Sequence, residues 1–321
     1  MTRRFLFLAI YAWFSVACWP QPASPAPQAT SSQQATSGAT TGVQTQNGNA
    51  NGPEIDLPLQ PKSVRFAVIG DSGTGDRAQY DVAHQMDTYH DKVGFNFVIM
   101  LGDNIYGGHL PSDFTKKFEI PYKSLLDAGV KFYAALGNHD DPSQERLYKP
   151  FNMNGKRYYT FKKGDVEFFV LDSNYMDPTQ LDWLDQSLQG SKAKWKICYF
   201  HHPLFSDGKH HGADMDLRAQ LLPLFQRYGV NVVFSGHEHV YERMKPEDNI
   251  YYFVLGNSGQ LMRHDFRTTK DMERSFDSDR SFMLVEIAGD KLYYQTVARN
   301  GETVDSGSVE HQSQSTSAAA H

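Results

Sequence analysis

The chain has 321 residues, of which 40% are hydrophobic and 21% are charged, a balance that excludes a collagen-like, coiled-coil or wholly disordered protein. Because its formal net charge is −6, no overall positive field would attract a nucleic acid, and we expect no nucleic-acid partner. Its two cysteines are too few for a disulfide framework or a zinc site of four thiolates. These numbers indicate a globular protein with one large domain or two small ones.

The amino-terminal residues predict export. Arg3 and Arg4 precede an apolar run at 5–17, which is typical of a signal peptide and too short to cross a bilayer, and we assign residues 1–19 to it. Cys18 follows Ser-Val-Ala, a sequence that loosely resembles the cleavage and acylation site of bacterial lipoproteins. Lipidation of Cys18, which would tether the protein to a membrane, and ordinary cleavage nearby both stay open. A periplasmic, secreted or lipid-anchored protein would fit.

Two segments of low complexity bound the predicted domain. Residues 20–53 contain no charged or aromatic side chain and consist almost entirely of Pro, Gln, Ala, Ser, Thr, Gly and Asn. Such a segment cannot bury enough apolar surface to offset its loss of conformational entropy, so it predicts a disordered tether. Residues 309–321 are similar in composition and predict a disordered tail. The domain is therefore expected at 54–308.

Within this domain, short apolar runs rich in β-formers alternate with amphipathic helical patterns, which predicts an α/β fold. In chain order we expect a strand at 64–69, a helix at 77–89, a strand at 97–101, a helix at 113–126, a strand at 132–136, paired strands at 157–161 and 166–171, a helix that begins at Pro178, a strand at 196–200, a helix at 216–227, and strands at 231–234, 251–255, 282–287 and 292–297. Pro223 should kink or split the helix that contains it, because proline lacks a backbone N–H.

Residues with metal-binding or catalytic side chains follow five of these strands. They are Asp71 after the first strand, Asp103 and Tyr106 after the second, Asn138, His139 and Asp140 after the third, His201 and His202 after the strand at 196–200, and His237 and His239 after the strand at 231–234. In open α/β sheets ligands bind beyond the carboxyl ends of the strands, so these side chains should meet at one edge. One Gly-Asp pair after a strand is an ordinary turn, whereas five such strand ends indicate a common site.

The types of side chain indicate a pair of metal ions. His237 and His239 alternate along an extended segment, so both can face the same one or two ions. The candidate ligands are Asp71, Asp103, Tyr106, Asn138, His201, His237 and His239. Oxygen and imidazole donors suit iron, zinc or manganese. Seven side chains are more than one tetrahedral ion could use, and two ions that share a bridging carboxylate fit the set.

Five motifs in this order resemble the purple acid phosphatases, within the calcineurin-like metallophosphoesterases. They are Asp-x-Gly at 71–73, Gly-Asp-x-x-Tyr at 102–106, Gly-Asn-His-Asp at 137–140, a strand that ends in His201, and Gly-His-x-His at 236–239, and the likeness spans 64–243. Many other metallophosphoesterases have histidine where Gly73 stands, and Tyr106 offers a replacement ligand. The resemblance implies a four-layer α-β-β-α sandwich of two mixed sheets flanked by helices, in the short, single-domain form of the family.

The resemblance also implies a role for each candidate residue. Asp71, Tyr106 and His239 would hold Fe(3+), Asn138, His201 and His237 would hold a divalent metal (Fe, Zn or Mn), Asp103 would bridge the two, and His139, His210 and His211 would face the substrate. Which of these last three histidines donates a proton stays open. His202 departs from the residue that is commoner at its position, so its role is open too.

The activity that follows is hydrolysis of phosphate monoesters at acid pH. A metal-bound hydroxide would attack phosphorus in line with the leaving group, which a histidine would protonate. Two alternatives stay open: a zinc or manganese phosphodiesterase or nucleotide hydrolase of the same fold, and a surface protein that binds metal or phosphate without turnover. Small phosphate esters are the expected partners, and the sequence does not indicate an oligomeric state.

Overall fold

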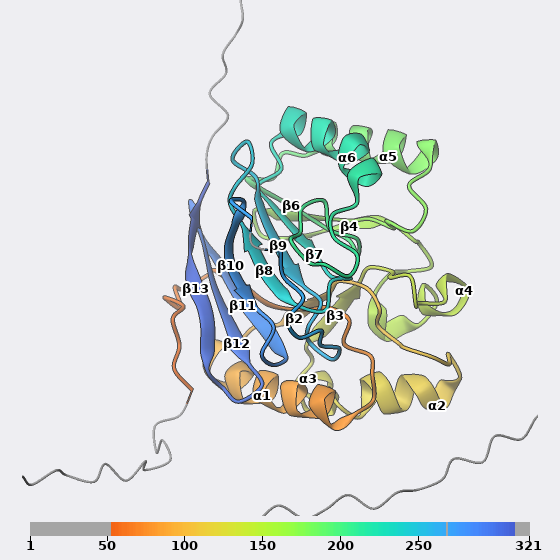
Figure 1. Ribbon diagram of the computed structural model, residues 1–321, viewed down its shortest axis with the longest axis vertical. Coiled ribbons are helices and arrows are strands. Elements are labelled where there is room, and N and C mark those ends of the chain that lie inside the picture. Colours follow the sequence, from red (N-terminus) through yellow and green to blue (C-terminus); the bar gives the residue numbers. More distant parts are fainter. Residues whose placement is uncertain (1–52, 268, 312–321) are drawn as a thin grey trace, which may run out of the picture. The chain divides into compact units, whose positions relative to one another are not determined.

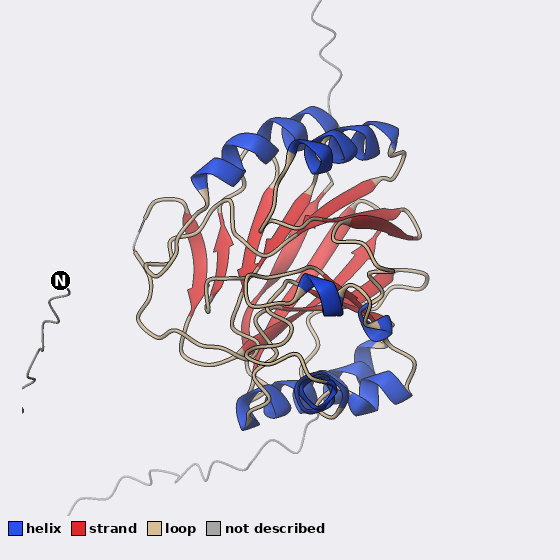
Figure 2. Cartoon of the chain, turned by 90° about the vertical axis from the view of Figure 1, so that its right-hand side faces the viewer, coloured by secondary structure: helices blue, strands red, loops and turns tan. Residues whose placement is uncertain are grey.

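The computed structural model describes residues 53–267 and 269–311. Two β-sheets lie face to face, and helices cover both outer sides (Figure 1, Figure 2). Helices α1 (Arg77–Val93) and α3 (Lys123–Asp127) lie on one side, and α5 (Pro178–Gly190) and α6 (Met215–Tyr228) lie on the other. The predicted α-β-β-α sandwich is thereby confirmed. The predicted signal peptide, nearly all of the tether and residues 312–321 lie outside the described residues.

The first sheet has six strands in the order β13-β12-β11-β1-β2-β3. Three of them, β1, β2 and β3, are parallel neighbours. Its strands are β1 (Val64–Ile69), β2 (Phe97–Met100), β3 (Lys131–Ala134), β11 (Ser281–Ala288), β12 (Lys291–Ala298) and β13 (Thr303–Glu310). β1 pairs with β2 and β2 with β3 in parallel, whereas β1 pairs with β11 antiparallel. The carboxyl ends of β1, β2 and β3 therefore lie at the same edge.

The second sheet has the order β10-β8-β9-β7-β6-β5-β4. Its strands are β4 (Tyr159–Lys163), β5 (Val166–Val170), β6 (Trp195–Tyr199), β7 (Val232–Ser235), β8 (Tyr241–Met244), β9 (Tyr251–Leu255) and β10 (Met272–Phe276). β5, β6, β7 and β9 are parallel neighbours. The carboxyl ends of β6 and β7 are thus adjacent, as expected if the histidines that follow these two strands share one site.

Aromatic residues hold the two sheets together. The ring of Phe66 on β1 stacks on Phe97 with centroids 5.1 Å apart, and its edge meets Phe168 of the second sheet at 5.3 Å. All three rings are buried, and each such burial stabilises the fold by about 1.5–3 kcal/mol. A separate apolar cluster joins Leu184 of α5 and Leu221 of α6 to the outer face of the second sheet. The sheets that carry the site are therefore packed on both faces.

The helices begin and end at capping residues. Asp76 caps α1 by accepting a hydrogen bond from Gln79, and Asp214 caps α6 by accepting one from Leu217. Gly94 ends α1 in the left-handed conformation. The shorter helical segments are α2 (Pro111–Phe114), η1 (Thr115–Glu119, a π-helix), α4 (Pro142–Glu145) and η2 (Lys149–Phe151, a 3₁₀ helix). None of the helices in the described ranges is both long and apolar enough to cross a membrane.

The structure corrects three predictions. The helix expected at 113–126 is three short pieces, α2, η1 and α3, with a break around Pro121. Pro223 lies inside an unbroken α6, because the buried apolar face of this helix holds it against the second sheet. The predicted domain boundary at 308 falls within β13, which continues to Glu310. There β13 pairs with β12 and buries Val309, so the domain includes part of the predicted tail.

Candidate metal centre

The predicted ligands follow the carboxyl ends of β1, β2 and β3 in one sheet and β6 and β7 in the other. Their turns are tightly bent: Asp71, Asp103 and His237 have positive φ angles of 52°, 51° and 71°. Non-glycine residues adopt this conformation at a cost, and it is concentrated at functional sites. The neighbouring glycines are needed for space, since a Cβ at Gly137 would collide with the Asp103 carboxylate and one at Gly236 with that of Asp71.

The first group of predicted ligands is close enough to share one ion. The Tyr106 hydroxyl lies 3.2 Å from Asp71 Oδ1 and 3.2 Å from His239 Nε2, and His239 Nε2 lies 3.4 Å from Asp71 Oδ1. The backbone N–H of His237 donates to Asp71 Oδ2 at 3.0 Å and so fixes the carboxylate. Three donor atoms from the loops after β1, β2 and β7 therefore lie close together.

The second group converges in the same way. His201 Nε2 lies 2.9 Å from Asn138 Oδ1 and 3.1 Å from His237 Nδ1. The other ring nitrogen of His201, Nδ1, lies 3.0 Å from the carbonyl oxygen of Leu101. A carbonyl oxygen can only accept a hydrogen bond, so this contact places the ring proton on Nδ1. The lone pair of Nε2 is then free to bind a metal ion, as in many metal-binding histidines.

Asp103 lies between the two groups. Its Oδ1 is 3.5 Å from His201 Nε2 in the second group, and its carboxylate clusters with Asp71 and His239 of the first, with one atom from each of these three within 4.8 Å of the others. The backbone N–H of His139 donates to Asp103 Oδ1 at 2.9 Å. The position is the one expected of a carboxylate shared by two ions.

The electrostatics of the centre fit bound cations. Burial raises the pKa of Asp71 to about 7 and also raises the pKa of Asp103. Burial likewise lowers the pKa values of His201 and His237, so both rings are neutral. Within the described ranges neither carboxylate has a lysine or arginine partner. Burial acts to lower the pKa of His239, but its contacts with Asp71 and Asp103 raise it overall. Two buried carboxylates thus share at most this one cationic ring, and bound metal ions would supply the remaining positive charge.

The three histidines predicted to face the substrate surround this centre unequally. The ring of His139 lies 4.9 Å from that of Tyr106, and the ring of His211 lies 4.0 Å from that of His237. His139 thus borders the first group and His211 the second. The ring of His210 packs on His211 at 4.2 Å. Among the described residues, His210 has no ring contact with a predicted ligand, so it lies farther out.

Two buried acids support the site and were not given a role from the sequence. Asp140 accepts hydrogen bonds from the backbone of Asn104 (2.7 Å), Ile105 (3.1 Å) and Gly137 (2.8 Å), which ties the loop after β2 to the loop after β3. Its place in the Gly-Asn-His-Asp motif was the available signal. Burial raises the pKa of Asp140 well above its usual range.

The second of these acids is Glu238, between two predicted ligands. Its Oε1 accepts hydrogen bonds from the backbone N–H of His211, at 2.6 Å, and of Gly212. The carboxylate lies against Gly208, where a Cβ would collide with it. Glu238 therefore holds the loop that carries His210 and His211, a role that nothing in the sequence indicates because the two segments are 26 or more residues apart.

Known proteins are similar to this chain in sequence and in fold. Residues 64–241 match the calcineurin-like phosphoesterase family. Purple acid phosphatase 17 of Arabidopsis thaliana is 30% identical over 232 residues, which cover 61% of this chain and 68% of that protein. The Fe(3+)-Zn(2+) purple acid phosphatase 12 of the same plant is 27% identical over 229 residues, which cover 61% of this chain and 48% of that protein.

A solved structure gives the same fold at lower sequence identity. Purple acid phosphatase PPD1 from yellow lupin seeds superposes with a TM-score of 0.65 at 18% identity, over 79% of this chain and 55% of that one. The predicted resemblance is thereby confirmed. The chain belongs to the calcineurin-like phosphoesterases and, within them, to the purple acid phosphatases, which are metal-dependent phosphoester hydrolases with a binuclear centre.

Proposed function

We propose that this protein is an exported acid phosphatase that hydrolyses phosphate monoesters. The observation that carries the proposal is the convergence of two groups of donor atoms on a shared carboxylate, Asp103. Histidines border both groups on the open side, with His139 beside Tyr106 and His211 beside His237. A dianionic phosphoryl group suits such a site, because cations attract it and imidazoles hydrogen-bond to its oxygens.

The two groups differ in charge, which supports two different metals. Asp71 offers an anionic oxygen, and Tyr106 would offer another once a bound ion displaced its phenol proton, so with His239 they would hold Fe(3+). Asn138, His201 and His237 are neutral donors and would hold a divalent ion such as zinc, the metal in the name of purple acid phosphatase 12. When bound, the ions supply charge neutralisation and lower the pKa of a coordinated water.

The protein's own residues would then orient the ester and move a proton. His139 and His211 lie where their ring N–H groups can donate to phosphoryl oxygens. Burial lowers the pKa of His211, and a nearby phosphate dianion would raise it again by attraction. His211 is therefore the first choice as proton donor to the leaving alcohol, with His139 as the second.

The proposal is tested by phosphate release and metal analysis on one sample. Purified protein should hydrolyse p-nitrophenyl phosphate faster below pH 7 than above it, and far faster than bis-p-nitrophenyl phosphate. It should contain one iron and one divalent metal per chain. A preference for the diester, with two zinc or manganese ions, would favour the phosphodiesterase. Bound metal without turnover of either ester would favour a binding protein.

The role of Tyr106 has an optical test. A phenolate bound to Fe(3+) absorbs visible light, so the wild type should be coloured and Tyr106→Phe should lose the band while keeping its fold. Tyr148→Phe is the matched control, because Tyr148 bonds to Glu119 away from the centre. A band that persists in Tyr106→Phe, or an active iron-loaded protein without one, would contradict the assignment.

Export is tested separately, in a bacterial host. The basic residues, apolar run and uncharged segment at 1–53 support cleavage of a signal peptide. If Cys18 is acylated, the wild type should partition with membranes, since more than one acyl chain anchors stably. Cys18→Ser should then release it and change its mass. Unchanged partitioning and mass would mean a protein without a lipid anchor, and a full-length protein in the cytoplasm would contradict export.

A further inference from the structure

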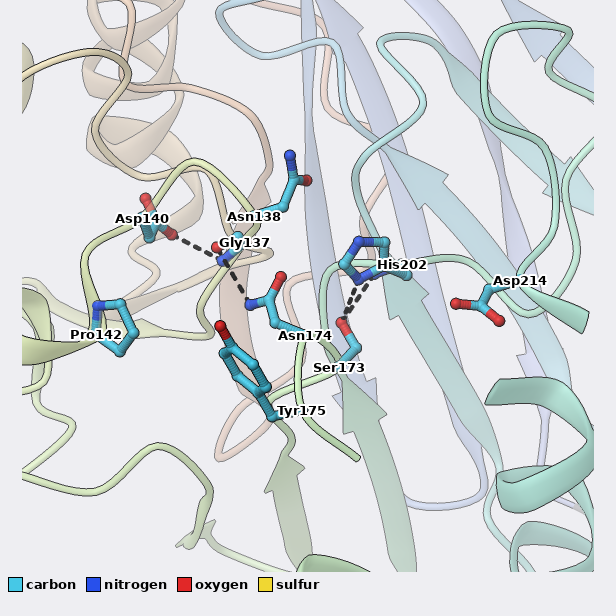
Figure 3. A pocket seen from close by; sticks show the side chains of 9 residues that line it. All are labelled: Gly137, Asn138, Asp140, Pro142, Ser173, Asn174, Tyr175, His202 and Asp214. Atoms are coloured by element: carbon cyan, nitrogen blue, oxygen red, sulfur yellow. Dashed lines mark hydrogen bonds between the residues drawn. The ribbon is translucent and has the colours of Figure 1, made fainter. Parts of the chain in front are cut away.

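A hollow of about 440 Å³ opens beside Asn138. It lies within the range of about 300–1,000 Å³ that is usual for small-molecule sites. Figure 3 shows Pro142 and Tyr175 on one side of it and His202 and Asp214 on the other, with Asn138, Ser173 and Asn174 between. Because Asn138 is a proposed metal ligand, the hollow borders the place where a phosphoryl group would sit. It therefore has the position of a site for the rest of the ester.

His202 forms the wall between this hollow and the second group of ligands. Its ring lies 4.4 Å from that of His237, and its Nδ1 lies 2.8 Å from Ser173 Oγ. The Ser173 hydroxyl also accepts from the backbone N–H of His202 at 3.1 Å, which fixes the pair. His202 also lines the neighbouring hollow of about 390 Å³ that contains His211. His202 is thus positioned by Ser173 and borders both hollows.

The hollow offers hydrogen-bonding atoms that nothing else uses. Within the described ranges the hydroxyl of Tyr175 and Oδ1 of Asn174 have no hydrogen-bond partner, and Oδ2 of Asp214 has none either. Tyr175 is 61% exposed, and its ring lies 5.7 Å from the guanidinium of Arg157. These groups donate to and accept from hydroxyls, and the ring offers a flat apolar face.

The charge of the hollow is negative. Asp214 lies on its wall with one oxygen capping α6. The described residues that line the hollow include no lysine or arginine. The nearby guanidinium of Arg157 is already bound by Asp172 at 3.1 Å and Asp177 at 3.3 Å. An anionic leaving group would therefore lie beside the Asp214 carboxylate, of which only one oxygen is bound to α6, and would be repelled by it, whereas a neutral one would not.

We propose that this hollow is a leaving-group subsite that selects neutral, hydroxyl-bearing alcohols, such as sugars and polyols, over anionic leaving groups such as phosphate. The selection depends on Asp214 for charge and on Tyr175 for contact area. The proposal rests on the proposed phosphatase function. Its substrates are accordingly sugar and polyol monophosphates rather than pyrophosphate or nucleoside triphosphates.

The charge is tested by Asp214→Asn, which keeps a helix-capping oxygen. kcat/KM is measured for glucose 6-phosphate and pyrophosphate, with Ki for inorganic phosphate as a measure of the phosphoryl site. The ratio of pyrophosphate to glucose 6-phosphate should rise about five- to tenfold, with Ki unchanged. Asp76→Asn is the matched control, because Asp76 caps α1 in the same way and lines neither hollow. An unchanged ratio in Asp214→Asn would overturn the proposal.

The contact surface is tested by Tyr175→Ala. It should lower kcat/KM for glucose 6-phosphate about five- to tenfold and leave Ki for phosphate unchanged, and Tyr175→Phe should retain most of the wild-type value. Equal values in all three proteins would overturn the role of Tyr175. A wild type that hydrolyses p-nitrophenyl phosphate but prefers pyrophosphate would overturn the subsite alone. A wild type that hydrolyses none of these esters would overturn the proposed function itself.

Discussion

Two regions meet at the centre and are held in different ways. The ligand set, meaning the seven proposed metal ligands, lies at or just beyond the ends of packed strands, and backbone groups bind several of its members. The histidine loop, meaning residues 205–214, belongs to no helix or strand. It is held by acidic side chains from other segments and by backbone hydrogen bonds to a second loop, from Lys209 to Asp265 and from Arg267 to Asp207. Glu242 binds Ser206 and Asp207, and Glu238 binds His211 and Gly212.

The difference predicts how each region responds to change. A ligand on a strand end is held by the whole sheet, so removing it empties a metal position without moving its neighbours. A loop held only by a second loop and by single side chains opens at a lower free-energy cost than a strand inside a sheet. Substitutions in the ligand set should therefore act as all-or-none changes in metal content, whereas those around the loop should change rate by degrees at constant metal content.

The largest effects are expected in the ligand set. His201→Ala should lose the divalent metal and His239→Ala the iron, each with a fall in kcat/KM of at least about 10³-fold, because the remaining ion cannot supply both metals' chemistry. Metal analysis with phosphate-release kinetics measures both. His84→Ala, an exposed histidine on α1, is the control. If both variants keep two metals, the proposed ligands are wrong.

His211→Ala should keep both metals and lose rate. Loss of a general acid typically costs about 10² to 10⁴ in rate. The loss should be larger for alkyl than for nitrophenyl phosphates, because a poor leaving group needs the proton more. His210→Ala should lose less, since its ring contacts only that of His211 among the described aromatic residues. Losses below about threefold on every ester in both variants would leave His139 as the remaining acid.

Glu238→Ala should have a smaller effect. It removes the acceptor for two backbone N–H groups, at about 0.5–1.5 kcal/mol for each hydrogen bond, so the closed loop becomes less populated. We expect kcat/KM to fall about tenfold with both metals retained. Glu238→Gln keeps an acceptor oxygen and should restore most of the activity. Loss of metal in Glu238→Ala would instead make Glu238 a support for His237 and His239.

The same contrast explains how far the sequence could predict this site. Residues at strand ends were predictable, because apolar runs mark strands and polar residues directly after them must lie at the sheet edge. The positions of Asp71, Asp103 and Asn138 at this edge were predicted in this way. Glu238 and Glu242 were not, because their partners lie 26 to 36 residues away and only the fold brings them together.

Two further features depended on tertiary packing. Tyr175 belongs to no motif, and its place beside Asn138 follows from how the loops after β3 and β5 meet. Pro223 favours a break by its own chemistry, but the buried residues Leu221 and Phe225 keep α6 against the second sheet. Local sequence therefore predicted which residues could act, and the fold decided which acidic and aromatic residues support them.

The last expected effect concerns stability around the histidine loop and leaves activity and metal content unchanged. Burial raises the pKa of Glu242 to about 8, although Ser206 and Asp207 hydrogen-bond to its carboxylate. A carboxyl whose pKa is higher in the folded than in the unfolded protein contributes stability that is complete below about pH 4 and is lost as the pH rises through about 8. Glu242→Gln cannot ionise, and its amide can still accept from Asp207 and donate to Ser206.

The free energy of unfolding of the wild type should therefore fall relative to that of Glu242→Gln between pH 5 and pH 8.5, by no more than about 4 kcal/mol. Urea unfolding at several pH values measures the difference. Glu247→Gln is the control, because Glu247 is exposed and its variant should run parallel to the wild type. Parallel curves for Glu242→Gln and the wild type would mean that Glu242 is ionised throughout. The loop would then be held by a charged carboxylate at every pH in this range. The hydrogen bonds from Ser206 and Asp207 to Glu242 should not weaken between pH 5 and 8.5.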